Sequence, residues 1–260
     1  MNLFDSHAHY NDEKFDNDRK EIIEQTLKNG VSNFIVAGYN IESSKKALNI
    51  VKEYKELYSI VGISPNDIED IKEDKDIDTN ILEIEKLIKT DDNEKIVAVG
   101  EIGLDYYWTK ENKERQIYVF EEMLKIAKES NLPVIVHNRD ATKDIYELLK
   151  EYNVKGIIHC FSGSVETAKE FIKLGFLIGI GGVVTFKNAK HLKEVVQNIP
   201  MSCISLETDS PYLTPEPFRG KKNNPAYLTY IVKKIAELKG INEEEVRKVT
   251  SCNVISKFDL

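Results

Sequence analysis

The chain has few cysteines and no long apolar run. Cys160, Cys203 and Cys252 are its three cysteines, and no C-x-x-C spacing occurs among them. This number and spacing argue against a disulfide framework and against a zinc site built from thiolates. We therefore expect reduced, mostly buried thiols. Because no apolar segment approaches the roughly 20 residues that a membrane-spanning helix needs, we also expect no membrane partner.

Positive charge is also scarce. The chain carries 36 Lys and Arg against 44 Asp and Glu, which gives a formal net charge of -8. Nonspecific binding of nucleic acid depends on cationic side chains that neutralise phosphates, so any such contact must be local and metal-assisted. Residues 1–15 have neither the basic start nor the apolar run of a secretory signal, and we expect a cytoplasmic protein.

The remaining composition is that of an ordinary globular protein. Apolar residues make up 41% and charged residues 31% of the chain, which is enough to bury a large core under a solvated exterior. A length of 260 residues suits an α/β barrel folded as one unit. Since no internal repeat and no Pro/Gly-rich linker divides the sequence, we expect a single domain over residues 1–260.

Short apolar runs rich in β-forming residues recur along the whole chain. They predict strands at residues 3–4, 34–37, 58–63, 96–99, 133–136, 156–158, 176–180 and 203–206. These runs show little alternation, which suits strands buried on both faces, as in a parallel sheet covered by helices.

Polar segments with helical spacing separate these runs. In residues 113–130, Ile117, Phe120, Leu124 and Ala127 share one stripe. Eight alternating strand and helix units favour a closed TIM-type (β/α)8 barrel, an α/β fold, over the competing doubly wound open sheet. Helical segments at residues 225–239 and 242–258 follow the eighth strand, so the barrel should carry a C-terminal helical addition.

The placement of the histidines is the most informative feature of the sequence. His7 and His9 lie two residues apart at the end of the first apolar run, a spacing that directs both imidazoles to one face of a strand. His137 and His159 directly follow the fifth and sixth runs. A single imidazole at a strand end often caps a backbone carbonyl, but four in this pattern indicate metal ligands. His191 fits no such position, and we expect it on an exposed helix.

Two carboxylates complete the candidate ligand set. Glu101 follows the fourth apolar run and Asp209 follows the eighth. In a barrel the C-terminal ends of the strands meet at one mouth, so these six side chains should converge. Six protein ligands are too many for one open catalytic zinc site. They suit two divalent cations that share a carboxylate, with Mg²⁺, Mn²⁺ or Zn²⁺ as candidates, and such a pair is suited to phosphodiester hydrolysis.

At this point the chain resembles the TatD-related DNases. The resemblance rests on FDSHAH at residues 4–9, GEIGLDY at 100–106, HNR at 137–139, HCFSG at 159–163 and ETDSPYL at 207–213, with RGKKNNP at 219–225 as a further landmark. These motifs span nearly the whole chain in the family's order. The resemblance implies a barrel related to the amidohydrolases, two divalent cations and hydrolysis of DNA, commonly as an exonuclease.

The resemblance also implies a role for each ligand. His7, His9 and Asp209 would hold one ion, His137 and His159 the other, and Glu101 would bridge them. Asp209, beside the expected nucleophilic water, is the candidate general base, so Asp209 and Glu101 are the predicted catalytic residues.

The sequence departs from the family pattern at two positions. Ser64 stands where the family usually has the histidine of a Gly-x-His-Pro pattern, and Asn224 stands where it often has Glu. Metal binding should survive the first change, because that histidine is not a primary ligand, while contacts to phosphate or the rate could differ.

Four residues are predicted to contact the substrate. Arg139 and Arg219, with Lys221 and Lys222 nearby, could pair with phosphate. Ser162 opens a helix whose free backbone amides attract anions, although Ser164 could act there as a plain N-cap. Tyr106, followed by Tyr107 and Trp108, could stack on bases, or the three could form a hydrophobic lid. Solvated loops are the alternative for the lysines.

The sequence therefore predicts a monomeric, metal-dependent phosphodiesterase acting on DNA, on single strands or at ends. Three alternatives stay open: an amidohydrolase-like enzyme cleaving a small amide or ester, a phosphomonoesterase, and a non-catalytic metal-binding barrel. The glycines at residues 179–182 do not form a phosphate-binding motif, and a tight turn at the strand end is the expected reason for them.

Overall fold

The computed structural model describes residues 3–71, 73–92, 94–108 and 111–260. It divides into two compact units. Unit 1 comprises Met1–Val36 and His159–Leu260, and unit 2 comprises Ala37–Ile158. Within the described residues, strand and helix alternate eight times along the chain and a ninth helix follows, which is the element order of a (β/α)8 barrel with a C-terminal addition.

The strands of unit 1 form parallel pairs. β1 (Leu3–Ala8) pairs with β2 (Val31–Ala37), and β7 (Leu177–Ile180) pairs with β8 (Ile204–Leu206). The Ser6 hydroxyl donates a 3.0 Å hydrogen bond to the carbonyl of Leu206, which ties β1 to β8. The ends of β1 and β8 therefore lie close together, and this neighbourhood positions the first group of candidate ligands.

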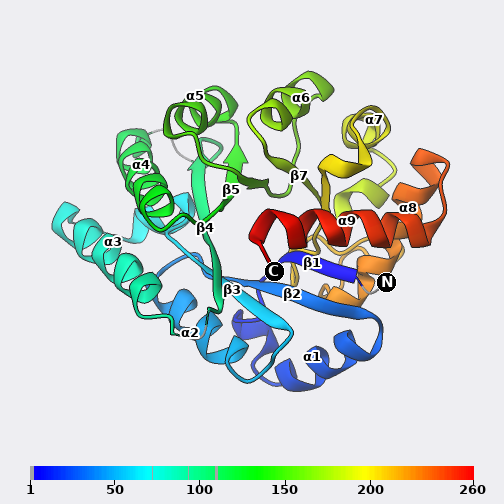
Figure 1. Cartoon of the computed structure of the whole chain (residues 1–260), viewed down its shortest axis with the longest axis horizontal. Helices are drawn as coiled ribbons and strands as arrows, with labels where there is room; N and C mark the ends of the chain where they lie inside the picture. Colours follow the sequence, from blue (N-terminus) through cyan, green and yellow to red (C-terminus); the bar gives the residue numbers. More distant parts are fainter. Residues whose placement is uncertain (1–2, 72, 93, 109–110) are drawn as a thin grey trace. The chain divides into compact units, whose positions relative to one another are not determined.

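The helices of unit 1 follow these strands in the chain. They are α1 (Arg19–Lys28), α6 (Val165–Lys173), α7 (Lys190–Asn198), α8 (Leu228–Lys239) and α9 (Glu243–Phe258), with short 3-10 helices η1 (Glu13–Phe15), η3 (Gly182–Thr185), η4 (Met201–Cys203) and η5 (Pro225–Tyr227). α9 begins after Asn242, whose side chain accepts from the Glu245 amide, and it packs against β1 and β8 (Figure 1).

Unit 2 contains a parallel sheet in chain order. Its strands are β3 (Leu57–Val61), β4 (Ile96–Asp105), β5 (Val134–Arg139) and β6 (Gly156–Ile158). Its helices are α2 (Ile41–Val51), α3 (Asp74–Lys89), α4 (Lys113–Glu129) and α5 (Thr142–Tyr152), with η2 (Pro65–Asp70) as a 3-10 helix. α2 and α3 pack on β3, α4 on β4 and α5 on β5 (Figure 1).

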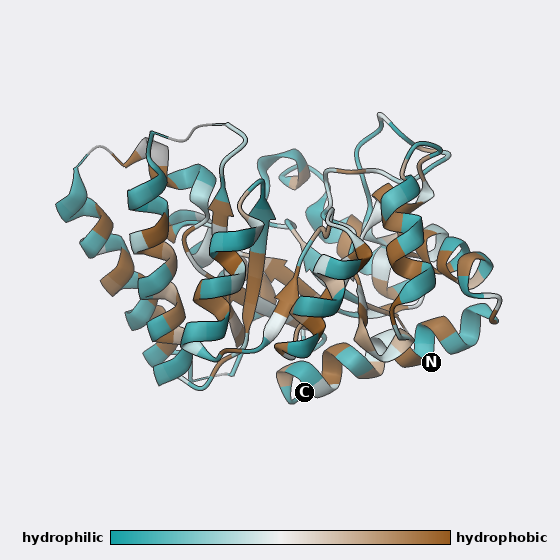
Figure 2. Cartoon of the chain, turned by 90° about the horizontal axis from the view of Figure 1, so that it is seen from above, coloured by the Kyte–Doolittle hydropathy of each residue, from teal (hydrophilic) through white to brown (hydrophobic). Residues whose placement is uncertain are grey.

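Apolar burial explains why these segments fold as they do. Every residue of β4 is buried, as expected for a strand covered on both faces. Each helix buries one stripe, which in α3 consists of Ile77, Ile81 and Ile84 at helical spacing, while its charged residues face outward. Figure 2 shows this alternation of hydrophobic and hydrophilic residues around the helices. Each buried isoleucine contributes roughly 2 kcal/mol of transfer free energy.

The predicted strands are all present, but β1, β2, β4 and β5 each extend at least three residues beyond the predicted apolar runs. β4 was predicted to end at Val99 and continues to Asp105, and β1 continues past Phe4 to Ala8. The added residues include Glu101 and His7, so these side chains project from within strands rather than from the loops after them. The sequence-based strand ends were placed too early because polar residues follow the apolar runs. These polar residues belong to the candidate site and not to a solvated turn.

The expectation of mostly buried thiols was wrong. Cys160 and Cys203 are half-buried and Cys252 is exposed. Cys160 follows β6, Cys203 precedes β8, and Cys252 lies on the outer side of α9. In the part of the chain that the structure describes, no helix has the length and apolar character needed to cross a membrane.

Candidate metal centre

Three predicted ligands of unit 1 meet at the ends of β1 and β8. The Nε2 atoms of His7 and His9 lie 3.3 Å apart, and Nε2 of His9 lies 3.2 Å from Oδ1 of Asp209. Nε2 of His7 is 3.8 Å from the same oxygen. Two backbone bonds hold the arrangement: the Asp209 amide donates to the His7 carbonyl, and the His9 amide donates to the Ser210 carbonyl. Their ligand atoms thus converge on one point.

This spacing fits a divalent cation. Two atoms that each lie about 2.0–2.2 Å from one ion, at tetrahedral or octahedral angles, are separated by about 3.0–3.5 Å. The three distances among His7, His9 and Asp209 fall in or near that range. Two imidazoles and one carboxylate leave further coordination positions for water or substrate, as catalytic sites require.

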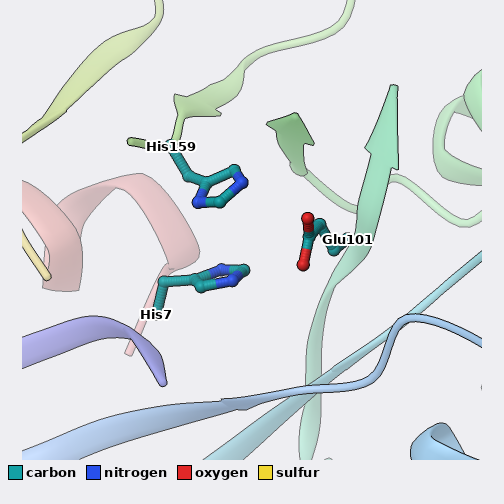
Figure 3. Close-up of side chains that lie close together, drawn as sticks. All are labelled: His7, Glu101 and His159. Atoms are coloured by element: carbon teal, nitrogen blue, oxygen red, sulfur yellow. The ribbon is translucent and has the colours of Figure 1, made fainter. Parts of the chain in front are cut away.

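His159 stands beside His7 in the same unit. The two imidazole rings are stacked, with centroids 4.2 Å apart and an interplanar angle of 22° (Figure 3). Both side chains are buried, at 0% and 5% exposure. Three of the four predicted ligands of unit 1, His7, His9 and His159, are buried, and Asp209 is partly buried beside them.

Asp209 is a carboxylate held in an unusual backbone position. Its φ is 54°, in the left-handed region, which turns the chain sharply after β8. Burial raises the pKa of its carboxyl, but the hydrogen bond from His9 and the charges of His9, His7 and His159 outweigh burial, and the net pKa is lowered. The surrounding imidazoles thus favour its ionised form.

Asp5 supports this cluster through hydrogen bonds to His7 and Thr208, and it was not predicted as a functional residue. Its carboxylate accepts hydrogen bonds from the backbone amide and hydroxyl of Thr208, at 3.0 and 2.6 Å, and from the His7 amide. Burial raises its pKa to about 7 against these bonds. Asp5, His7 and His9 are spaced by two, so strand periodicity was a signal that could have identified Asp5.

Glu207 is a second unpredicted acid in this cluster. It is fully buried, its Oε1 accepts a hydrogen bond from the Cys160 amide, and its Oε2 has no hydrogen-bond partner among the described residues. Burial raises its pKa to about 8. The bond to Cys160 fixes the backbone immediately after His159, so Glu207 supports the position of that imidazole. Its spacing of two from Asp209 was again the available signal.

Gly179 makes room for Glu207. A Cβ atom on Gly179 would lie 2.6 Å from Oε2 of Glu207 and 3.0 Å from Cα of His159. The expectation that glycines here serve a tight turn is therefore corrected for Gly179, which lies inside β7 and is required for close approach.

Unit 2 carries a second group on β4 and β5. Nδ1 of His137 lies 3.2 Å from Oε1 of Glu101, and Nε2 of His137 lies 3.0 Å from Oδ2 of Asp105. Figure 3 shows the carboxylate of Glu101 extending from β4. The 3.2 Å distance fits two ligands of one ion, while Asp105 on the other side of the ring can fix its orientation.

Asp105 and His137 stabilise each other's charged forms. Burial lowers the pKa of His137, yet hydrogen bonds to Asp105 and Glu101 raise it to about 9. Burial raises the pKa of Asp105, and bonds from His137 and the Tyr107 amide lower it below its usual value. Gln116 anchors the Asp105 backbone at both its amide and its carbonyl. Asp105 was missed, although it follows Glu101 at a spacing of four on one strand face.

Arg139 lies in an aromatic cluster with two exposed rings. Its guanidinium lies 3.7 Å from the ring centroid of Tyr107 and 5.3 Å from that of Trp108. Tyr107 is 55% exposed and Trp108 69% exposed. Tyr106 differs from the stacking role predicted for it: its side chain is 8% exposed, and its hydroxyl donates to Asp144. Tyr107 and Trp108 are therefore the exposed rings of this group, and Tyr106 is not.

The late loop of unit 1 holds the other predicted cations. Arg219 is exposed, with its guanidinium 4.4 Å from the ring centroid of Phe186. Lys222 forms a 2.7 Å ion pair with Asp18, so its charge is already paired within the protein and is less available to a phosphate. Ser162 is exposed next to the start of α6, where Ser164 accepts from the Thr167 amide as an N-cap. The capping alternative is thus confirmed for Ser164.

The two departures from the family pattern have structural roles here. Ser64 is buried and caps η2 by accepting from the Asn66 amide. Asn224 caps η5 by accepting from the Ala226 amide. His191, expected on an exposed helix, is exposed in the first turn of α7.

Comparisons with solved structures define the fold class. The chain matches the crystal structure of YJJV, a TATD homologue from Escherichia coli, with a TM-score of 0.92 and 29% identity over 99% of this chain and 98% of that one. It also matches a phosphotriesterase homology protein from E. coli at 15% identity and a TM-score of 0.68, a similarity that shows the fold alone. The predicted TIM-type (β/α)8 fold with a C-terminal helix is confirmed, and the open sheet is excluded.

Sequence relatives define the class of protein. YabD of Bacillus subtilis is 44% identical over 98% of both chains, and YcfH of E. coli is 34% identical over 100% of this chain and 97% of its own. Both are named as uncharacterized metal-dependent hydrolases, and metal-dependent hydrolase is the class that fold, ligand cluster and relatives share. The model of the TatD related DNase family matches residues 4–259, so this chain belongs to that family.

Proposed function

We propose that this protein hydrolyses phosphodiester bonds in DNA with two divalent cations. The observation that carries the proposal is the cluster of His7, His9 and Asp209, whose ligand atoms all lie within 4.8 Å of one another. In TIM barrels the C-terminal ends of the strands surround one active site. We therefore propose that His159, Glu101 and His137 complete the ligand set, and that Glu101 would serve as a ligand to both cations.

The chain's own residues have distinct tasks in this reaction. Divalent cations at such a site lower the pKa of a water and neutralise charge on the phosphate. Asp209 accepts the proton of the attacking water as general base, because it is a partly buried carboxylate beside the ligand imidazoles. Asp105, through its contact with His137, and Glu207, through its bond to the Cys160 amide, act as positioning residues for His137 and His159.

The DNA substrate is supported by local features and not by net charge. Arg139 offers a planar cation that can pair with phosphate, and Tyr107 and Trp108 offer exposed rings on which bases stack. This pattern fits single strands or unpaired ends, where bases are accessible. Arg219 and Ser162 are proposed as further phosphate contacts.

Cleavage of an end-labelled, single-stranded DNA oligonucleotide tests the proposal. Metal-stripped protein receives Mg²⁺, Mn²⁺ or Zn²⁺, and Glu101→Ala is compared with Glu147→Ala, an exposed glutamate of α5. Metal-dependent shortening that persists in Glu147→Ala and is lost in Glu101→Ala supports the nuclease. Metal binding without shortening, together with turnover of a small amide, lactone or phosphomonoester, would replace it with one of the other hydrolases. Metal binding with no turnover of any of these would indicate a non-catalytic barrel.

A cytoplasmic location and a monomeric state complete the proposal. Light scattering that gives the mass of one chain would support the monomer, and a mass of two chains would overturn it. Cell fractionation tests the location in the same way.

A further inference from the structure

Unit 1 contains a cavity that the metal cluster does not use. It has a volume of about 200 Å³ and lies between the segment after β6, the start of η3 and the start of α7. Phe161, Val183 and Leu192 belong to its apolar lining, and its exposed polar residues are Ser162, Asn188, Lys190 and His191. An apolar hollow with a few converging polar groups is the usual form of a ligand site.

The cavity adjoins the candidate metal centre through one short segment. Cys160 lines the cavity and directly follows the predicted ligand His159. Its amide donates to Glu207, and a Cβ atom added to Gly181, another lining residue, would lie 3.6 Å from Cγ of the same glutamate. A group in the cavity and a phosphate beside His159 could therefore belong to the same nucleotide, only a few bonds apart.

The size and chemistry of the cavity select its occupant. At about 200 Å³ it is smaller than the roughly 300–1,000 Å³ of sites that enclose a whole small molecule, so it suits one group of a larger substrate. Apolar walls suit a flat ring, while the serine, lysine and histidine can hydrogen-bond to polar ring edges. A nucleobase combines these properties and is attached to a phosphate by a sugar.

We propose that this cavity is a subsite for one nucleobase of the DNA strand, next to the phosphate bound at His159. The inference rests on the proposed nuclease function and adds a specificity-determining pocket to it. Ser162 belongs to this pocket and is thereby assigned a base contact in addition to its proposed phosphate contact.

Nucleoside binding tests the subsite without turnover. Thymidine and deoxyadenosine, which carry no phosphate, are titrated into ¹³C-methyl-labelled protein while the methyl signals of Val183 and Leu192 are followed by NMR. Ala189, another lining residue, is replaced by tryptophan to fill the cavity and by serine as a control of similar size. We expect saturable shifts in wild type and Ala189→Ser. We expect at least about tenfold weaker binding in Ala189→Trp, because the indole would occupy the cavity and deny the base its stacking contacts there.

The outcomes separate the subsite from the nuclease activity. Absence of nucleoside-induced shifts in a protein that cleaves DNA would overturn the subsite and leave the nuclease standing. Saturable shifts in a protein that cleaves no DNA would support a nucleobase pocket and remove the nuclease. Equal binding of phenol or 2-deoxyribose, or unchanged binding in Ala189→Trp, would contradict recognition of a base.

Discussion

Asp105 holds Nε2 of His137 at 3.0 Å, on the opposite side of the ring from Glu101. A carboxylate in this position fixes the orientation of an imidazole ligand and makes its other nitrogen more basic. We expect Asp105→Asn to weaken metal binding by about 10- to 100-fold. Calorimetric titration with Mn²⁺ measures the change. Asp140→Asn, an exposed neighbour of β5, serves as control, and equal affinities in the two variants would rule out this role.

His9 should couple metal binding to folding. A cation that binds only the folded state raises the midpoint of thermal unfolding, and the rise grows with metal concentration. Since His9 contributes one of three converging ligand atoms in unit 1, His9→Ala should lose most of this rise. Scanning calorimetry with and without added metal checks the prediction. A variant that metal stabilises as strongly as it does wild type would show that His9 is not a ligand.

Gly179→Ala should destabilise the protein. The added Cβ would lie 2.6 Å from Oε2 of Glu207 and 3.0 Å from Cα of His159, so the core must shift, at a cost of about 1–3 kcal/mol. Gly181→Ala is the matched control, because its Cβ would meet Glu207 at an ordinary 3.6 Å. Urea unfolding compares the two variants. Equal stability would show that Glu207 can move away freely.

Metal-free protein should become less stable as pH rises from about 5 to 8. Burial raises the pKa of Glu207 to about 8, so in this window the folded state retains a proton that the unfolded chain releases. The free energy of unfolding therefore falls until pH passes the folded pKa. Glu207→Gln removes this contribution and should show a shallower fall in urea unfolding. Parallel pH profiles would mean that Glu207 does not titrate in this way.

Much of the fold could be predicted from the sequence because its signals are local. Apolar runs buried on both faces gave all eight strands in order, and helical stripes gave the helices between them. The end of β4 was misplaced because Glu101 and Asp105 interrupt the apolar pattern. A strand that ends in a functional site carries the same polar residues as a strand that ends in water, so hydropathy alone cannot separate the two.

The metal ligands could also be predicted from a local signal, because four of the five histidines lie at or directly after the end of an apolar run. Asp5, Asp105 and Glu207 were missed because acids are common on surfaces. Their spacing from the predicted ligands was the available sequence signal, and their burial becomes visible only in the folded structure. The burial of Tyr106 beside exposed Tyr107 depends on its bond to Asp144, which lies 38 residues away in sequence. The cavity beside Cys160 likewise depends on packing between three separate segments.

Hydrolysis of single-stranded DNA, measured as a function of bound metal, tests whether two divalent cations are needed for catalysis. Metal-stripped protein is loaded with known equivalents of Mn²⁺, and the rate at which a labelled oligonucleotide shortens is measured at each loading. We expect no shortening without metal and full activity only when a second equivalent is bound. Full activity in metal-free protein, or no shortening with two equivalents bound, would contradict it.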